Sequence, residues 1–144
     1  MEDKFYQMYE VAFACFNKAY APYSKFKVGA CVRMKNGDLI GGCNVENASY
    51  GLCICAERNA LFQAVAKGYK KDDIDCLLVL TDTVRAGSPC GACRQVMSEL
   101  MDQDAIVYLT NIGRMDGNKI IRDTKIMSVK ELLPYAFEQS DLDV

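Results

Sequence analysis

The sequence contains no histidine among its 144 residues, and this absence excludes several kinds of active site. A Ser-His-Asp triad, a Cys-His nucleophile pair and a histidine-based zinc site all need an imidazole ring. Tryptophan is also absent, whereas the composition includes Cys 8. Any metal chemistry in this chain must therefore use thiolates and carboxylates as ligands.

Long apolar runs are missing as well. A membrane-spanning helix needs about 20 apolar residues, and the longest run without a charge covers only residues 47–56. The N-terminal residues lead into an amphipathic pattern that does not look like a signal peptide. The cysteines are about 6% of the chain, below the roughly 8–10% of short secreted disulfide scaffolds. We expect a cytoplasmic protein with reduced thiols and no membrane partner.

Neither sign of charge dominates the composition. Lys plus Arg number 17 and Asp plus Glu number 19, which gives a net charge of -2 and a pI near 5.2. Nucleic-acid-binding domains usually carry a basic patch, so nucleic acid is not the expected partner. Hydrophobic residues make up 51% of the chain, which is enough to fill one core. Since there is no repeat, low-complexity tract or linker, residues 1–144 are expected to form a single domain.

Apolar periodicity predicts helices and strands that alternate along most of the chain. Helices are expected near residues 3–19, 55–67, 90–102 and 129–138. Strands are expected near residues 26–34, 39–43, 76–80, 105–109 and 119–126. About ten residues separate the last two strands, whereas a parallel crossover needs about a dozen or more, so this pair should be antiparallel. The order predicts an α/β fold: a three-layer α/β/α domain around a mixed five-stranded sheet.

Two short motifs place cysteines at the starts of predicted helices. They are Cys-Ala-Glu-Arg at residues 55–58 and Pro-Cys-Gly-Ala-Cys-Arg at residues 89–94. Free amides and the helix dipole stabilise a thiolate at such a position. Cys90 and Cys93 can chelate one zinc ion, and Cys55 can add a third thiolate from the other helix. Three protein ligands leave the fourth position open for water, which is the pattern of a catalytic site.

Charged side chains next to these cysteines complete the candidate site. Glu57 follows Cys55 by two residues, so its carboxylate can reach a water molecule at the open position. Three thiolates outweigh the charge of a divalent zinc ion, so a cation should compensate. Arg58 and Arg94 stand three and four residues after a cysteine, on the same helix face. The alternative is that both arginines are solvated surface groups.

Together these motifs resemble those of the zinc-dependent nucleoside deaminases, whose signature pairs a metal ligand and a glutamate with a later Pro-Cys-x-x-Cys. Three further segments, at residues 21–26, 42–48 and 131–134, look like the small homotetrameric cytidine deaminases. The resemblance covers about residues 10–138. The stretch from Gly113 to Thr124 is the one unfamiliar part. The chain is therefore similar to the cytidine/deoxycytidine deaminase family over most of its length.

The resemblance implies a zinc-dependent hydrolase with one zinc ion per subunit. Its expected reaction is the deamination of cytidine and 2'-deoxycytidine to uridine and 2'-deoxyuridine with release of ammonia, a step of pyrimidine salvage. Glu57 would take a proton from water, protonate N3 of the ring, and later protonate the leaving amino group. The expected partners are the nucleoside and other copies of the chain in a homotetramer.

The resemblance also implies substrate-binding residues. Phe26 would stack near the base, Asn44 and Glu46 would bind the ribose hydroxyls, and Ala56 would contact the substrate. From the residues alone, Phe26 could instead pack in the core, and Asn44 and Glu46 could be turn formers. Contacts across a subunit interface are implied for Ala48, Tyr50 and Phe137.

Other functions remain open at this stage. Cys53 could join the other three cysteines in a four-thiolate structural zinc site, in which Glu57 would have no catalytic role. A deaminase acting on polynucleotides is a second alternative, although it would need a positively charged groove and a surface on which bases stack. A deaminase for a nucleoside antibiotic with a cytosine ring is a third, although the Asn44 and Glu46 pair argues against it.

Overall fold

The chain is described by a computed structural model that covers residues 2–142. Helices and strands alternate along most of it, as the periodicity predicts. In chain order the α-helices and strands are α1 (Glu2–Phe16), β1 (Val28–Met34), β2 (Leu39–Cys43), α2 (Ala56–Ala66), β3 (Ile74–Thr81), α3 (Gly91–Leu100), β4 (Ile106–Asn111), β5 (Arg114–Asp116), β6 (Lys119–Ile121), β7 (Thr124–Ser128) and α4 (Val129–Leu132). Short 3-10 helices lie at η1 (Tyr50–Leu52), η2 (Lys71–Asp73) and η3 (Gln139–Leu142).

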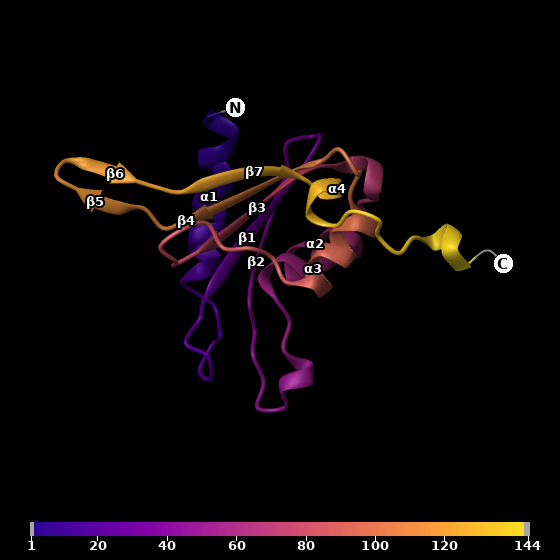
Figure 1. Cartoon of the computed structure of the whole chain (residues 1–144), viewed down its shortest axis with the longest axis horizontal. Coiled ribbons are helices and arrows are strands. Elements are labelled where there is room, and N and C mark those ends of the chain that lie inside the picture. The colour runs from indigo at the N-terminus through magenta and orange to yellow at the C-terminus, as the bar shows by residue number, and fades with distance from the viewer. Residues whose placement is uncertain (1, 143–144) are drawn as a thin grey trace.

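Five strands form the central sheet in the order β2-β1-β3-β4-β7 (Figure 1). β3 and β4 are parallel, with α3 on the crossover between them, whereas the other neighbouring pairs are antiparallel. This arrangement confirms the predicted mixed sheet and its antiparallel last pair. No helix within residues 2–142 combines the length and the apolarity that crossing a bilayer requires.

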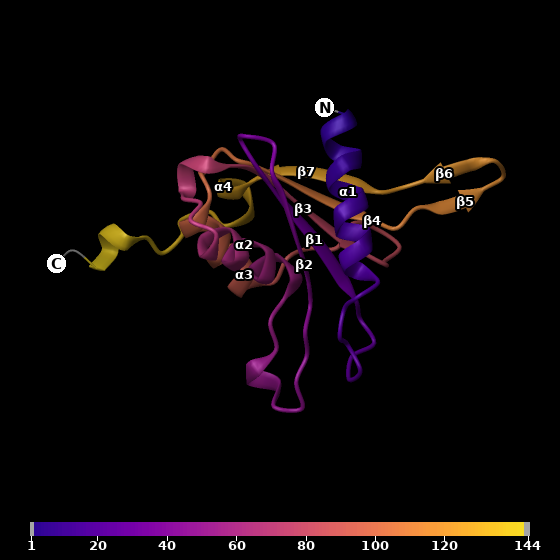
Figure 2. The same cartoon turned by 180° about the vertical axis from the view of Figure 1, so that it is seen from behind.

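Helices cover both faces of the sheet. α1 lies on one face, and α2 and α3 lie on the other (Figures 1 and 2). β3 packs against the helices on both faces of the sheet because successive side chains of a strand point to opposite faces. Its residues Cys76, Leu78 and Leu80 pack with α1, whereas Leu77 and Val79 pack with α2 and α3. The apolar run at residues 76–80 of β3 is therefore buried on both faces of the sheet, as expected for a central strand.

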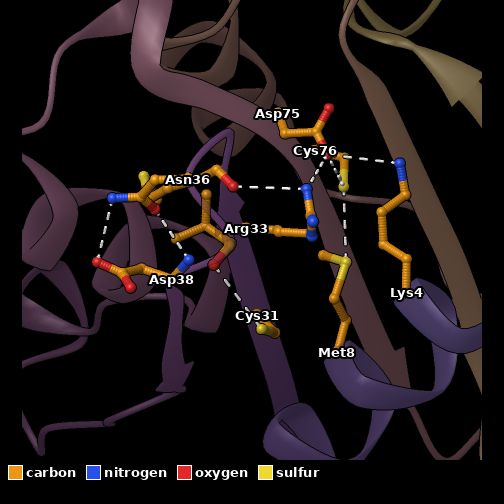
Figure 3. A network of polar contacts seen from close by, with 10 residues as sticks. Lys4, Met8, Cys31, Arg33, Asn36, Asp38, Asp75 and Cys76 are labelled. Atoms are coloured by element: carbon orange, nitrogen blue, oxygen red, sulfur yellow. Dashed lines mark hydrogen bonds and ion pairs between the residues drawn. The ribbon is translucent and has the colours of Figure 1, made fainter.

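A polar network ties α1 to the edge of this core (Figure 3). The Asp75 carboxylate accepts from Nη1 of Arg33 at 2.7 Å and from Nζ of Lys4 at 3.4 Å. Burial opposes ionisation of Asp75, but the two cations outweigh it and hold the pKa of this carboxyl group below its usual range. Beside it, Sγ of Cys76 lies 3.5 Å from Sδ of Met8. The network anchors the first turns of α1 against β1 and β3.

The end of the chain differs from the expectation. α4 ends at Leu132 and does not continue to residue 138. Pro134 has no amide hydrogen for a helix, and Tyr135 has a φ of 52°, in the left-handed region. These two residues stop the helix, and the chain continues as an arm that points away from the sheet (Figure 1).

The last strand of the sheet also starts later than expected. β7 covers Thr124–Ser128, not residues 119–126. The unfamiliar stretch before it forms a separate hairpin of β5 and β6 that projects from the sheet (Figure 1). Its turn is Gly117-Asn118, between the paired residues Asp116 and Lys119, and Gly117 has a φ of 63°. The hairpin pairs residues 119–121, which periodicity had assigned to the last strand of the sheet, with residues 114–116, which had been expected in a connection.

The segment before β1 differs as well. α1 ends at Phe16 and not near residue 19, and β1 begins at Val28 and not at Phe26. The Tyr20 amide donates to the carbonyl oxygen of Asn44 at 3.0 Å, and the Glu46 amide donates to the carbonyl oxygen of Tyr20 at 2.8 Å. Residues 20–27 therefore run beside the segment after β2 and do not extend the helix or the strand.

β2 and α2 lie so close together at Gly42 that adding one methyl group there should strongly lower the stability of the fold. A Cβ atom on Gly42 would lie 2.6 Å from both the carbonyl oxygen of Ala56 and the amide nitrogen of Ala60. We expect Gly42→Ala to lower the free energy of unfolding by about 2 kcal/mol or more, because these backbone atoms must shift. Urea unfolding measures the change, with Gly51→Ala as the control, since a Cβ on Gly51 meets nothing within 4 Å. Equal unfolding midpoints for the two variants would contradict the packing described here.

Candidate active site

Three cysteine sulfurs converge at one place in the described part of the chain. The Sγ atoms of Cys55, Cys90 and Cys93 all lie within 4.8 Å of one another. Those of Cys55 and Cys90 are 3.8 Å apart, and tetrahedral zinc with Zn–S bonds of about 2.3 Å also holds its sulfurs about 3.8 Å apart. Residues 2–142 contain no second cluster of three such ligands. The donor atoms and their spacing fit a zinc ion.

The N-termini of two helices supply these sulfurs. Cys55 is the N-cap of α2, Cys90 is the N-cap of α3, and Cys93 lies in the first turn of α3. The Cys93 amide donates to Sγ of Cys90 at 3.5 Å. Free amides and the positive end of each helix dipole stabilise negative charge on the sulfurs. Both helices begin within about one residue of where the sequence predicted them.

Arg58 brings a positive charge to the sulfurs. Its Nη2 donates to Sγ of Cys55 at 3.4 Å. A hydrogen bond from the Cys93 thiol is the main cause that lowers the pKa of Cys55 to about 5, and the bonds from Arg58 and Cys90 add to it against the effect of burial. The Nε atom of Arg58 is buried and has no hydrogen-bond partner within the described chain. Arg58 is therefore placed where charge compensation was expected.

Glu57 is a buried carboxylic acid at the start of the same helix. Its side chain is 4% exposed, and it is the second residue of α2. Burial raises the pKa of its carboxyl group, and the negative charge of Cys55 adds to the rise. A carboxyl group in such a place is suited to accept and to return a proton.

Arg94 has other partners than the expected ones. Its Nε donates to the carbonyl oxygen of Pro89 at 2.8 Å, and its Nη1 donates to that of Leu132 at 2.7 Å. Its Nη2 donates to the hydroxyl of Ser88. All three nitrogens are thus bonded away from the sulfurs, and Arg94 joins the loop before α3 to the end of α4. These bonds give Arg94 a structural role, and its part in compensating the charge of the thiolates stays a prediction.

Cys53 lies outside the sulfur cluster. Its Sγ accepts from the Asn47 amide at 3.2 Å and lies 3.6 Å from the carbonyl oxygen of the same residue. The cluster of three sulfurs does not include it. The alternative of a four-thiolate structural site is therefore not favoured.

The candidate substrate residues lie on the segments beside β1 and β2. Phe26 is 46% exposed, so it is not a core residue. Asn44 is buried, and its Oδ1 accepts from the Val28 amide at 2.8 Å while its Nδ2 donates to the carbonyl oxygen of Phe26 at 2.7 Å. Ala56 is fully buried and follows Cys55 directly. The structure thus brings Asn44 and Phe26 into contact, which the sequence could not show.

Glu46 contacts a residue that the sequence analysis missed. Its Oε1 accepts from the amides of Tyr23 and Ser24, both at 3.1 Å, and its Oε2 accepts from the Ser24 hydroxyl. A pocket of about 360 Å³ opens here, lined by Tyr23, Ser24, Glu46, Tyr50 and Cys53. A serine after Pro-Tyr is a common turn residue, and nothing in its spacing indicated a contact to residue 46.

The residues expected at a subunit interface are exposed in the single chain. Ala48 and Tyr50 lie in the loop after β2, and the Tyr50 side chain is 76% exposed. Phe137 lies on the C-terminal arm and is 56% exposed, while its carbonyl oxygen accepts from Nε2 of Gln95 at 3.0 Å. Phe137 is therefore not the end of a packed helix.

The comparisons with known proteins agree with this geometry. The family profile described as "Cytidine and deoxycytidylate deaminase zinc-binding region" matches residues 2–110. The chain belongs to this family. The cytidine deaminase of Halalkalibacterium halodurans is 50% identical over 125 residues, which are 87% of this chain and 87% of that protein. The cytidine deaminase of Sporosarcina psychrophila is 43% identical over 125 residues, which are 87% and 85% of the two chains.

The fold agrees with that of a solved family member. The crystal structure of cytidine deaminase from Burkholderia pseudomallei superimposes with a TM-score of 0.82 at 49% identity, covering 92% of this chain and 98% of that one. Family membership therefore makes zinc the cofactor of this domain, and the three-sulfur cluster is where it fits.

Proposed function

We propose that this chain catalyses the hydrolytic deamination of cytidine and 2'-deoxycytidine to uridine and 2'-deoxyuridine, with release of ammonia. The observation that carries the proposal is the convergence of three sulfurs beside the buried carboxyl group of Glu57. The names of the family members described above give the substrate class. This combination is the machinery of metal-assisted hydrolysis.

Cys55, Cys90 and Cys93 would hold the zinc ion, one per subunit. When bound there, zinc supplies Lewis-acid activation of a water molecule at neutral pH. Arg58 donates to a ligand sulfur and so offsets part of the negative charge of three thiolates. The remaining chemistry is proton transfer by this chain's own residues.

Glu57 would carry the protons of the reaction. It takes one proton from the attacking water and delivers it to N3 of the pyrimidine while the water oxygen bonds to C4. It then takes the second proton and delivers it to the amino group, which leaves as ammonia when its bond to C4 breaks. The sum is one nucleoside plus one water giving one deaminated nucleoside and one ammonia. Because both transfers use one carboxyl group, its burial beside the sulfurs is central to the proposal.

Phe26, Asn44, Glu46 and Ala56 would bind the nucleoside within one subunit. Phe26 is exposed enough to stack on the base, and Asn44 and Glu46 present polar groups to the ribose. The side chains of Asn44 and Glu46 still have hydrogen-bonding capacity beyond their internal contacts.

Further contacts would come from other subunits of a homotetramer. Ala48 and Tyr50 on one loop and Phe137 on the C-terminal arm are exposed and face away from the core. Contiguous exposed apolar surface marks sites where another chain binds, and Tyr50 and Phe137 would each add a large side chain to such a surface. We place the assembled enzyme in the cytoplasm, in pyrimidine salvage, without a nucleic-acid or membrane partner.

Turnover of four candidate substrates tests the proposal. We expect the zinc-loaded protein to release ammonia from cytidine and 2'-deoxycytidine, but not from free cytosine or a short cytosine-containing oligonucleotide. The reason is that the polar groups beside Phe26 match a ribose, whereas a net charge of -2 does not favour a polyanion. Ammonia release and the change in ultraviolet absorbance measure the reaction. Turnover of the oligonucleotide, or none of cytidine, would overturn the proposal.

A further inference from the structure

The backbone of Phe26 is held on both sides by polar side chains. Its amide donates to the hydroxyl oxygen of Ser24 at 3.0 Å, and its carbonyl oxygen accepts from Nδ2 of Asn44 at 2.7 Å. The Ser24 hydroxyl in turn donates its proton to Oε2 of Glu46. The candidate base-stacking residue is therefore joined to both candidate ribose residues, to Asn44 directly and to Glu46 through Ser24.

Hydrogen bonds from Tyr23 and Ser24 occupy most of the acceptor sites of the Glu46 carboxylate. An ionised carboxylate offers about four lone-pair sites. Two amides, those of Tyr23 and Ser24, occupy Oε1, and the Ser24 hydroxyl occupies one site on Oε2. The hydrogen bonds from Ser24 hold the pKa of this carboxyl group below its usual range. One acceptor site on Oε2 remains for a ligand, and its direction depends on the Ser24 hydroxyl.

The turn that contains Ser24 depends on its hydrogen bonds to Glu46. The Lys25 amide donates to the carbonyl oxygen of Ala21 at 3.0 Å, and Lys25 has a φ of 62°. A side chain other than glycine is strained in this left-handed region. Ser24 and Phe26, on either side of Lys25, are exposed, so little apolar packing holds the turn. Its conformation therefore depends on the three bonds to Glu46.

We propose that Ser24 is a positioning residue for ribose recognition, because its hydroxyl orients the Glu46 carboxylate and fixes the turn before Phe26. This inference rests on the proposed function and adds a residue to it. Ser24 acts through Glu46 and takes no part in the chemistry at C4 of the base. It should therefore affect nucleoside binding and not the chemical step.

The test compares two serine variants on two substrates. We expect Ser24→Ala to raise the KM for cytidine about tenfold, since a charge-assisted hydrogen bond is lost, with kcat changed less than about twofold. For 2',3'-dideoxycytidine, which lacks the 2'- and 3'-hydroxyls, the KM should change less than about twofold, because Asn44 still holds Phe26. Ser24→Thr keeps the hydroxyl and should restore the KM for cytidine. Ser140→Ala, on the exposed C-terminal arm, is the matched control and should behave like the unmodified protein.

A double-mutant cycle with Glu46→Gln gives a second, independent readout. If Ser24 acts through Glu46, the double variant should have no higher KM for cytidine than the worse single variant. Additive effects, an equal rise in KM for both nucleosides, or a fall in kcat alone would overturn the role of Ser24. These outcomes require an active unmodified enzyme, so absence of cytidine turnover in that enzyme would instead refute the proposed function.

Discussion

Replacing Glu57 with glutamine is expected to lower kcat for cytidine by about 10⁴-fold, because two proton transfers are lost and each typically contributes at least about 10²-fold. That loss corresponds to about 5.5 kcal/mol of transition-state stabilisation. Glutamine keeps the size of the side chain, so the buried site at the start of α2 should remain intact. Steady-state kinetics with cytidine measures the effect.

Two measurements separate lost chemistry from a damaged fold. The zinc content and the thermal midpoint of Glu57→Gln should equal those of the unmodified protein, since the three sulfurs are untouched. Glu99→Gln is the matched control, because Glu99 is exposed on α3. The activity of this variant should equal that of the unmodified protein. If Glu57→Gln kept most of the activity, Glu57 would not be the proton carrier.

Removal of zinc with a chelator is expected to abolish activity and to lower the thermal midpoint. The ion would join the N-termini of α2 and α3, and a ligand that binds only the folded state stabilises it by mass action. At free zinc about 100-fold above its dissociation constant, this contribution is about 2.7 kcal/mol. Added zinc should restore both properties. Metal analysis verifies that the zinc is removed, and the cytidine assay and differential scanning calorimetry measure the two effects.

Matched cysteine variants assign the metal to its ligands. Cys93→Ser should lose the zinc and the activity, whereas Cys53→Ser should keep both, because Sγ of Cys53 is bonded to Asn47 and lies outside the cluster. Loss of zinc from Cys53→Ser would support the alternative of a four-thiolate structural site. Retention of zinc by Cys93→Ser would contradict the assignment of the three-sulfur cluster as the metal site.

Elements with long and regular apolar patterns were predictable from the sequence. β3 is the clearest case, because an apolar run of this length can satisfy burial on both faces only at the centre of a sheet. The starts of α2 and α3 were predictable because cysteine and proline stand where helical periodicity begins. The antiparallel pairing of β4 and β7 followed from the short connection between them.

Local patterns were less reliable where side chains or turns compete with the regular elements. Residues 119–121 were expected in the last strand of the sheet, but the Gly117-Asn118 turn pairs them with residues 114–116 in a separate hairpin. Phe26 was expected in β1, but the side chains of Ser24 and Asn44 bind its amide and carbonyl groups. Arg94 was placed by helical spacing, which does not show that carbonyl oxygens from other segments surround it.

The sequence by itself determined which atoms are available for chemistry: no imidazole, several thiols, and a glutamate next to one of them. It also determined that two of these thiols stand at helix N-termini, because capping and periodicity are local properties. Only the tertiary structure decided that Cys55 and Cys90, which are 35 residues apart, meet at 3.8 Å. The physical reason is that α2 and α3 pack on the same face of one sheet, which aligns their N-termini. Likewise, Ser24 meets Glu46 only because the segments before β1 and after β2 run side by side.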